Sequence, residues 1–382
     1  MVTPGPLDLI DPEAVKGLIL SGGAGTRLRP ITHTSAKQLV PVANKPILFY
    51  GIEDMAEAGI KEIGIIVGET RADIEEAVGD GSRFGVEVTY IPQDAPLGLA
   101  HCVLIAKDFL GDDDFVMYLG DNMLQQGLVD FVTRFEEQQR RAHQPTLEAD
   151  YVPPSCQILL SRVPDPHRFG IAEVDAAGHI VRLVEKPEDP PSDLALVGVY
   201  LFTSAIQQAV AAIEPSWRGE LEITDAIQWL IDNGHRVRHE LLEGWWLDTG
   251  KKDPLLESNR RVLETIEPRI DGSLDATSKA DGRVVIEAGA VLINSHVRGP
   301  AIIGARTRLE NSYVGPFSAV ANDCVIIDSE VEHSVILEHV KIIGVPRIED
   351  SLLGRHVEVH RTQLRPKATR LMLGDHSLVD LE

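Results

Sequence analysis

Apolar residues recur every six positions over a long stretch near the carboxyl end of the chain, and few folds explain such a period. An α-helix repeats every 3.6 residues and a strand every two, so neither element accounts for it. A parallel β-helix does, because each coil has three short sides and each side contributes one inward residue. The recurring positions, interrupted by one slip of a single residue, are Val291, Val297, Ile303, Leu309, Val314, Val320 and Ile326. We predict a left-handed, hexapeptide-like parallel β-helix with a tail over residues 271–382, with a small antiparallel β domain as the alternative.

The preceding part of the chain has a different pattern, in which short apolar runs alternate with helical periodicity from residue 15 to about residue 240. Strands separated by helices predict an α/β fold: a Rossmann-like, mostly parallel mixed sheet with helices on both faces. We expect this domain over residues 15–253, after a loose extension at 1–14 and before a connecting helix at 254–270. Ligands of such sheets bind beyond the carboxyl ends of the strands, so the loops there are the candidate site.

The first of these loops is rich in glycine, since residues 20–30 read LSGGAGTRLRP. It is not a P-loop, because no lysine follows the glycines, and Pro30 prevents the long helix that a dinucleotide-binding loop requires. Glycines still let backbone N–H groups approach an anion closely, and the Arg27 guanidinium can bridge two phosphate oxygens. Alone, the loop indicates either an anion site or a glycine turn with a surface arginine.

Charge and cysteine content exclude several classes of partner. With 36 basic and 59 acidic side chains the formal charge is −23, which repels nucleic acid and anionic membranes. No apolar run is long enough to span a bilayer, and the amino terminus does not resemble a secretory signal. Cys102, Cys156 and Cys324 are far apart and lack CxxC spacing, which argues against disulfides and zinc. We expect a cytoplasmic protein with neither a nucleic acid nor a membrane as partner.

A second motif changes the interpretation of the glycine loop. Residues 35–48 read SAKQLVPVANKPIL, which places Lys37 ten residues beyond Arg27. Together the two stretches form the pattern G-G-x-G-T-R-L-x-P … K-Q-L-x-P-V-x-x-K-P. This string is the signature of sugar nucleotidyltransferases, and the chain resembles the glucose-1-phosphate thymidylyltransferases, in a long form with a C-terminal β-helix. The resemblance implies transfer of dTMP from dTTP to α-D-glucose 1-phosphate, giving dTDP-glucose and pyrophosphate for deoxysugar synthesis, with Mg²⁺ as cofactor.

Further matches assign residues to the nucleotide. Residues 92–103, PQDAPLGLAHCV, resemble the base-binding loop of the family, in which the amide of Gln93 can pair with N3 and O4 of thymine. From the sequence alone the same stretch is a loop and the start of a helix, and both interpretations can hold. By resemblance, the nucleotide contacts are Leu20, Gly22, Gly23, Gly25, Thr26, Arg27, Gln93, Gly98 and Asp121.

Two aspartates and three basic residues complete the catalytic set that the resemblance implies. Asp121, in YLGDNML, and Asp248, in GWWLDTG, match the metal-binding carboxylates, and Mg²⁺ prefers such oxygen ligands together with water and phosphate oxygens. The expected catalytic residues are Arg27, Lys37 and Lys186. Because the sugar phosphate is itself the nucleophile, catalysis rests on positioning and on neutralising charge.

Four later strings resemble the sugar-phosphate half of the site: RFGIAEV, RLVEKP, ALVGVYLF and RGELEITDA. The contacts that they imply, with two from the strings above, are Asn122, Gly170, Glu185, Lys186, Val197, Arg218 and Trp246. Ordinary structural roles are the alternatives, such as a solvated pair for Glu185 and Lys186 and packing for Trp246. We also expect Thr224 to act as the N-cap of the following helix.

The pattern departs from short members of the family at two positions, where Phe169 and Leu97 replace a frequent Tyr and Asp. Neither change removes a proposed phosphate contact, although either could shift sugar or base preference. The β-helix is expected to serve oligomerisation or regulation, with the chain forming a homo-oligomer. Two alternatives stay open: the same reaction with UTP or another sugar 1-phosphate, and a non-catalytic regulatory subunit that binds a nucleotide sugar. The retained Arg27, Lys37 and Asp121 argue against the second.

Overall fold

The computed structural model describes residues 15–23, 28–29, 31–33, 36–142 and 151–361. These residues divide between two compact units, drawn from Met1–Ala24 with Leu48–Trp246 and from Gly25–Ile47 with Leu247–Glu382. The stretch before Leu48, which carries Lys37, therefore belongs to the same unit as the carboxyl-terminal part of the chain.

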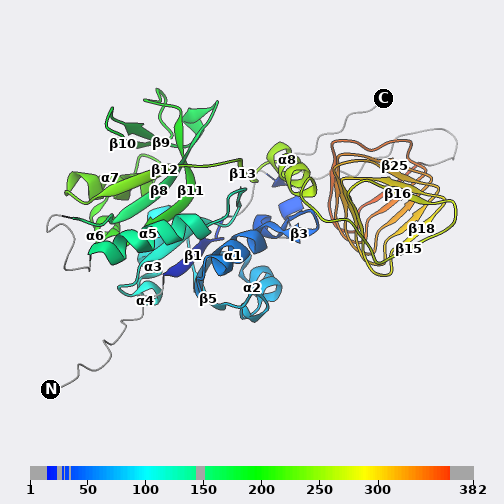
Figure 1. Ribbon diagram of the computed structural model, residues 1–382, viewed down its shortest axis with the longest axis horizontal. Helices are drawn as coiled ribbons and strands as arrows, with labels where there is room; N and C mark the ends of the chain where they lie inside the picture. The colour runs from blue at the N-terminus through cyan, green and yellow to red at the C-terminus, as the bar shows by residue number, and fades with distance from the viewer. Residues whose placement is uncertain (1–14, 24–27, 30, 34–35, 143–150, 362–382) are drawn as a thin grey trace, which may run out of the picture. The chain divides into compact units, whose positions relative to one another are not determined.

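A nine-stranded mixed sheet is the centre of the first unit (Figure 1). The strands of this part of the sequence are β1 (Lys16–Leu20), β4 (Glu62–Val67), β5 (Glu87–Pro92), β6 (Phe115–Leu119), β7 (Asn122–Leu124), β8 (Cys156–Arg162), β9 (Gly170–Val174), β10 (Ile180–Glu185), β11 (Leu194–Phe202), β12 (Val237–Leu241) and β13 (Trp246–Asp248). Strands β6, β1, β4 and β5 are parallel neighbours, and β11 pairs antiparallel with β6, β8 and β9. The mostly parallel mixed sheet predicted from the sequence is confirmed.

Helices cover both faces of this sheet because its central strands are apolar on both sides. The helices are α1 (Ile47–Glu57), α2 (Arg71–Val78), η4 (Ser82–Phe84), α3 (Leu99–Ile105), α4 (Lys107–Leu110), α5 (Val129–Ala142), η5 (Pro166–Arg168), α6 (Ile206–Ala212) and α7 (Ile223–Asp232). Leu18 and Leu20 of β1 pack into one core with apolar residues of α3, α6 and α7. On the other face α1 approaches so closely that a Cβ on Gly17 would lie 2.6 Å from the Met55 sulfur.

The strand order reverses beside β1. After β1 the chain continues to β4 on one side, and it later returns to form β6 on the other side. Open α/β sheets bind their ligands in a crevice at such a switch point, so we expect the ligand at a β1–β6 crevice. The N–H of Gly120, just after β6, donates to the carbonyl of Leu20 at 3.0 Å. The glycine loop and Asp121 thus start from adjacent strand ends.

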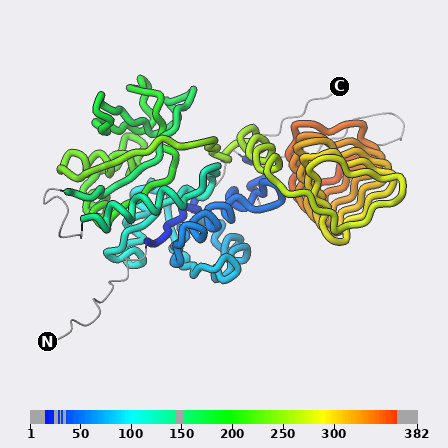
Figure 2. The backbone as a smooth tube through the Cα atoms, viewed as in Figure 1, coloured from blue at the N-terminus to red at the C-terminus, as the bar shows by residue number. Residues whose placement is uncertain are grey.

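The second unit contains a β-helix made of three parallel sheets, whose stacked coils are visible in Figure 2. Its strands are β14 (Arg269–Ile270), β15 (Ser273–Leu274), β16 (Lys279–Asp281), β17 (Val284–Ile286), β18 (Val291–Ile293), β19 (His296–Arg298), β20 (Ala301–Ile303), β21 (Arg308–Glu310), β22 (Tyr313–Val314), β23 (Ser318–Val320), β24 (Val325–Ile327), β25 (Glu330–Val331), β26 (Val335–Ile336), β27 (Lys341–Ile343), β28 (Leu352–Leu353) and β29 (Glu358–His360). Each strand pairs with its equivalent in the next coil, as Val291 does with Arg308. The predicted β-helix is confirmed, and its handedness stays a prediction.

The inward side chains of the coils form a continuous apolar core. Six predicted inward residues are fully buried there: Val297, Ile303, Leu309, Val314, Val320 and Ile326. Val291 was assigned wrongly, because it is only half-buried whereas Leu292 is fully buried. The cause is the coil length, since corner residues such as Asn294 and Asn311 bond to one another across 17 positions. A coil of this length cannot be divided into three equal steps of six.

The second unit also holds an earlier segment and one long helix. These elements are η2 (Ile31–His33), η3 (Lys37–Leu39), β2 (Pro41–Val42), β3 (Lys45–Pro46) and α8 (Lys252–Leu263).

All three cysteines are buried and free, as small packed side chains. Within the residues that the structure describes, the helices are too short or too polar to cross a bilayer.

Candidate active site

The described part of the glycine loop is fixed against the end of β4. The N–H of Ser21 donates to the carbonyl of Ile66 at 3.0 Å, which continues the pairing of β1 past its end. A Cβ on Gly68 would lie 2.8 Å from the carbonyl oxygen of Gly22, so the two backbones touch. Gly23 is exposed. The loop is therefore held on one side and open on the other, as an anion site requires. Gly25, Thr26 and Arg27 lie outside the described residues.

Gln93 faces this loop from the end of β5. Its N–H donates to the carbonyl of Val67 at 2.8 Å, which fixes its backbone. A Cβ on Gly22 would lie 2.6 Å from the Gln93 Oε1 atom, so the amide oxygen occupies the space that this glycine leaves. On the other side of the amide, Nε2 lies 3.2 Å from the Cys102 sulfur and 3.3 Å from Nδ1 of His101.

Cys102 sets the orientation of this amide. Burial raises the pKa of its thiol to about 12, so the sulfur keeps its proton at neutral pH. That proton is donated to the carbonyl of Gly98, with the sulfur 3.6 Å from the oxygen. The sulfur can then only accept from Gln93, which must turn its NH₂ group toward Cys102 and its oxygen toward the glycine loop. An acceptor facing the loop suits a ligand with an N–H group.

Gly98 could not be any other residue. It precedes α3 with φ at +106°, a conformation that glycine adopts without strain. A Cβ there would lie 2.3 Å from the carbonyl oxygen of Leu221. That carbonyl accepts the N–H of Ala100 at 3.0 Å, and the N–H of Leu221 donates to Leu97 at 2.8 Å. The base-loop candidate is thereby fastened to the segment that follows Arg218.

Three of the predicted sugar-phosphate residues form a charged cluster. Lys186 Nζ lies 3.1 Å from Glu185 Oε1, and Arg218 Nη1 lies 3.6 Å from the same oxygen. Arg218 is also held by Glu222 at 3.1 Å and by Glu220 at 3.0 Å. The structure thus brings two cations together and holds them with the three carboxylates of Glu185, Glu220 and Glu222.

The backbone around this cluster is unusual. Lys186 has φ at +39°, which is uncommon for a residue with a side chain, and its N–H donates to the carbonyl of Phe169 at 3.0 Å. A Cβ on Gly170 would lie 2.7 Å from Cγ2 of Thr224 and 3.1 Å from the Glu185 carboxylate. Residues held in such uncommon backbone conformations often mark functional sites.

Thr224 is not the N-cap that the sequence suggested. Helix α7 begins at Ile223, Glu222 occupies the N-cap position, and no side chain caps the helix there. The Thr224 hydroxyl instead donates to Glu185 Oε2 at 3.4 Å. Burial raises the pKa of Glu222, although Ser216 donates a hydrogen bond to it, and burial followed by repulsion from Glu185 raises that of Asp225. Carboxylates are therefore crowded on the helix side of the cluster.

Asn122 and Trp246 form the neighbouring part of the site. The indole Nε1 of Trp246 donates to Asn122 Oδ1 at 2.7 Å, and its ring packs on Phe169 with centroids 5.2 Å apart. Gly198 lies at a bulge in β11, where a Cβ would come within 2.7 Å of the Asn122 amide nitrogen. Val197 beside it is fully buried. All seven predicted sugar-phosphate residues thus lie in the first unit, and Phe169 contacts both Lys186 and Trp246.

Lys37 and Asp248 belong to the second unit, so their place around these groups stays a prediction. Lys37 is half-buried at the start of η3, and its carbonyl accepts the N–H of Val40 at 3.2 Å. Asp248 accepts the N–H of Gly250 at 2.9 Å.

Sequence reasoning missed several residues that support the site. No sequence motif indicated that Cys102 and His101 contact the Gln93 amide. None indicated that Glu222 holds Arg218. The signal for Gly198 was present, because a glycine inside an apolar strand indicates a bulge or a close backbone approach.

Comparison with known proteins identifies one family of similar proteins. The family model described as Nucleotidyl transferase matches residues 16–265. A glucose-1-phosphate thymidylyltransferase of Streptomyces griseus is 58% identical over 95% of this chain and 98% of its own length. One of Streptomyces antibioticus is 55% identical over 96% of this chain and 100% of its own length. A crystal structure from Bacillus anthracis, assigned as a glucose-1-phosphate thymidylyltransferase, is similar with a TM-score of 0.59 and 34% identity, covering 66% of this chain and 97% of that chain.

Proposed function

The chain belongs to the nucleotidyl transferase family, among the glucose-1-phosphate thymidylyltransferases, and we propose that it transfers the dTMP unit of dTTP to α-D-glucose 1-phosphate beside the β1–β6 crevice. The observation that carries the proposal is the Lys186–Arg218 cluster, held by carboxylates in the same unit as Gly22, Gly23 and Gln93. The Lys186–Arg218 cluster suits a sugar phosphate, and the glycine loop with Gln93 suits a nucleotide. Homo-oligomerisation and a cytoplasmic location stay predictions.

The reaction needs no nucleophile from the protein. A phosphate oxygen of glucose 1-phosphate attacks the α-phosphorus of dTTP, the bond to the bridging β-oxygen breaks, and pyrophosphate leaves with the electron pair. Lys186 and Arg218 hold the attacking phosphate against repulsion from the triphosphate. The glycine-loop backbone holds the triphosphate, and Arg27 and Lys37 neutralise its charge by the family resemblance. Asn122, Glu185 and the backbone of Val197 contact the hexose, and Trp246 forms a wall beside it.

Gln93 reads the base in this proposal. Its oxygen faces the glycine loop and accepts N3–H of thymine, whereas cytosine has no hydrogen at N3. Uracil presents the same edge and lacks only one methyl group, which is worth about 1–3 kcal/mol of discrimination. The test is pyrophosphate release with glucose 1-phosphate and each of dTTP, UTP, ATP, CTP and GTP. We expect dTTP first, UTP second and CTP roughly 10²-fold or more below, because a mismatched edge leaves Gln93 unpaired. Equal rates with CTP would exclude this role of Gln93.

Magnesium fits the residues that are present. Among the described residues, no group of three or more His, Cys, Asp or Glu side chains is arranged to hold a metal. Mg²⁺ does not need such a group, because one or two carboxylates, waters and substrate phosphates complete its shell. Asp121 is half-buried and directly follows β6 at the crevice, which suits this role, and Asp248 is the second carboxylate by resemblance. The bound ion would neutralise phosphate charge.

Gly22→Ala is expected to raise KM for dTTP by about tenfold with little loss of stability. The new methyl group meets the end of the Gln93 side chain, which can move away but then no longer faces the base. A displaced hydrogen bond of this kind costs about 1–2 kcal/mol. Steady-state kinetics check the KM, and thermal unfolding checks the fold. In a Gln93→Ala background the same change should have almost no further effect, and an undiminished effect there would contradict the explanation.

Arg218→Gln is expected to raise KM for glucose 1-phosphate by about 10²-fold and to change KM for dTTP less than threefold. The guanidinium contacts the attacking phosphate in our proposal, and charged hydrogen bonds of this kind are worth about 1.5–3 kcal/mol. Arg140→Gln, on the exposed surface of α5, is the matched control. Equal increases in the two KM values would place Arg218 outside the sugar-phosphate half.

A further inference from the structure

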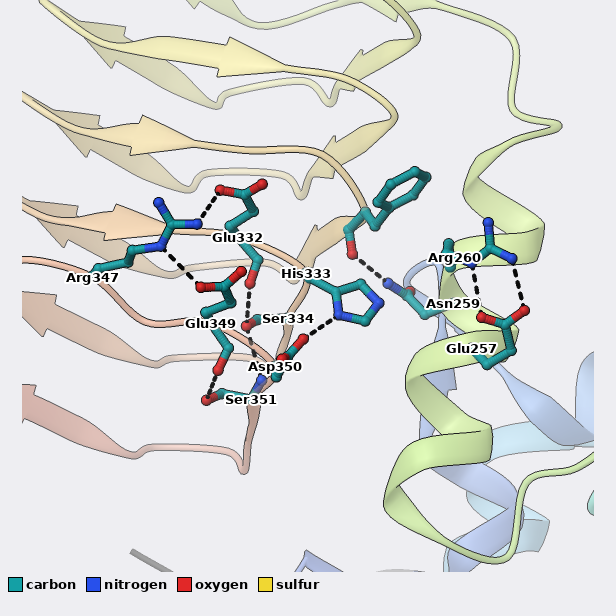
Figure 3. A network of polar contacts seen from close by, with 11 residues as sticks. Glu257, Asn259, Arg260, Glu332, His333, Ser334, Arg347, Glu349, Asp350 and Ser351 are labelled. Carbon is teal, nitrogen blue, oxygen red and sulfur yellow. Dashed lines mark hydrogen bonds and ion pairs between the residues drawn. The ribbon is translucent and has the colours of Figure 1, made fainter. Parts of the chain in front are cut away.

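The segment that carries Lys37 is folded onto α8 and the β-helix. The link is the side-chain amide of Asn259, which is fully buried on α8. Its Oδ1 accepts the N–H of Ala43 at 2.9 Å, and its Nδ2 donates to the carbonyl of Phe317 in the β-helix at 3.0 Å. Figure 3 shows Asn259 reaching from the helix toward the coils. One amide thus joins three segments that are far apart in the sequence.

A second amide repeats the connection from the other side. Nδ2 of Asn44 donates to the carbonyl of Val320 at 2.8 Å. Ala43 and Asn44 form the turn between β2 and β3, with φ at +48° and +60°, and Val42 pairs with Lys45 across it. Positive φ at both central residues is the geometry of a two-residue hairpin turn, although it is unusual for Ala43. The bonds to Asn259 and Val320 therefore add to the strand pairing that holds this turn.

The acceptors in the β-helix are themselves fixed. The N–H of Phe317 donates to the carbonyl of Pro300 at 2.6 Å, and Val320 is a fully buried residue of β23. On α8, hydrogen bonds from Arg260 and Arg261 to Glu257 lie beside Asn259 in the sequence and lower the pKa of Glu257 to about 2. Asn259 and Val320, the two partners of the turn, are both fully buried.

The turn is connected to Lys37 over a short distance in the chain. The N–H of Ile47 donates to the carbonyl of Val40, and the N–H of Val40 donates to that of Lys37, both at 3.2 Å. Gln38, Leu39 and Val40 are buried between them. A shift of the turn would therefore move the backbone of Lys37, since little of this segment is free to absorb it.

We propose that Asn259 and Asn44 are positioning residues that fix the Lys37 segment to the β-helix, and that the action of Lys37 depends on this attachment. The inference rests on the proposed function, because it assumes that Lys37 acts on the substrate phosphates. Asn259 is suited to this task because its amide both accepts from the turn and donates to the coil. Aspartate could only accept, and alanine could do neither.

The test is a double-mutant cycle in the full-length chain, combined with hydrogen exchange. The variants are Asn259→Ala, Lys37→Ala and their combination. Asn44→Ala is a further variant, which removes the other bond between the turn and the β-helix. Asn311→Ala is the matched control, because this asparagine bonds Asn294 and Asp328 at a corner of the same β-helix. Kinetics use dTTP, glucose 1-phosphate and Mg²⁺, and circular dichroism with thermal unfolding follows the fold.

We expect Asn259→Ala to lower kcat by about 10²-fold with KM values within threefold, as a misplaced catalytic group does. Amides of residues 36–47 should exchange at least roughly tenfold faster, because the turn opens locally. Asn44→Ala should also lower kcat and speed the exchange of these amides. Asn311→Ala should change neither kcat nor exchange. In the Lys37→Ala background, Asn259→Ala should lower kcat no further, since residues acting through one group are not additive.

Two results would overturn the inference while leaving the proposed function intact. One is a wild-type kcat for both asparagine variants together with an inactive Lys37→Ala variant. The other is an equal loss of kcat from Asn259→Ala with and without Lys37, because Asn259 would then act elsewhere. A fully active Lys37→Ala variant, with faster exchange in Asn259→Ala, would refute the assumed role of Lys37 and the inference with it.

Discussion

Replacing Lys37 by alanine is expected to lower kcat by about 10²–10³-fold while the protein stays folded. A preorganised positive group stabilises the negative charge that develops in the transition state, and removing one such group typically lowers kcat by this factor. The fold should tolerate the change because Lys37 is only half-buried, whereas the neighbours Gln38, Leu39 and Val40 that anchor the segment are untouched. The measurement is pyrophosphate release at saturating dTTP, glucose 1-phosphate and Mg²⁺, with thermal unfolding as the test of the fold.

Lys107→Ala provides the control, since this lysine is exposed at the start of α4. Its variant should keep the wild-type kcat, which excludes a general effect of lost positive charge on a strongly acidic chain. Lys37→Arg should recover part of the activity, because the charge returns on a longer and planar group. Wild-type turnover of Lys37→Ala would remove Lys37 from the catalytic set and leave the triphosphate charge to other residues.

The apolar residues predicted the β-helix, but they did not predict every residue that points inward. A step of six residues only approximates one third of a coil of 17, and polar residues show the coil length more clearly. Ser295, Ser312 and Ser329 recur at that interval, and each N–H donates to the serine hydroxyl of the preceding coil. Asn294 and Asn311 stand before them with positive φ, at one corner. Polar ladders fixed the coil length, and the apolar pattern alone could not show it.

The charged cluster follows from two short motifs, whereas the roles of its residues stay predictions. Glu185 and Lys186 are adjacent in the sequence, and the cluster that they form with Arg218 requires only that two loops meet. The orientation of Gln93 was not predictable, because it depends on a thiol that must first donate to the carbonyl of Gly98. The attachment of the Lys37 segment to the β-helix was not predictable either, because Ala43, Asn259 and Phe317 are far apart in the sequence.

Asp121→Ala is the second change with a very large expected effect, a loss in kcat of roughly 10³-fold that added Mg²⁺ does not restore. Asp121 follows β6 at the crevice, and the N–H of the adjacent Gly120 donates to the carbonyl of Leu20, so the backbone at Asp121 starts beside the end of β1. Asp121→Asn keeps the shape and an oxygen but loses the charge, and it should raise the Mg²⁺ concentration needed for half-maximal rate by at least about tenfold.

Asp112 is the matched control, because it is exposed just before the amino end of the same strand, at the opposite edge of the sheet. Asp112→Ala should leave both kcat and the Mg²⁺ dependence unchanged. If Asp121→Asn shifts the Mg²⁺ dependence and Asp112→Ala does not, the metal is bound at the crevice. If Asp121→Asn keeps the wild-type Mg²⁺ dependence and Asp121→Ala keeps most of its turnover, Asp121 is a turn residue. The strand end would then position the backbone rather than the ion.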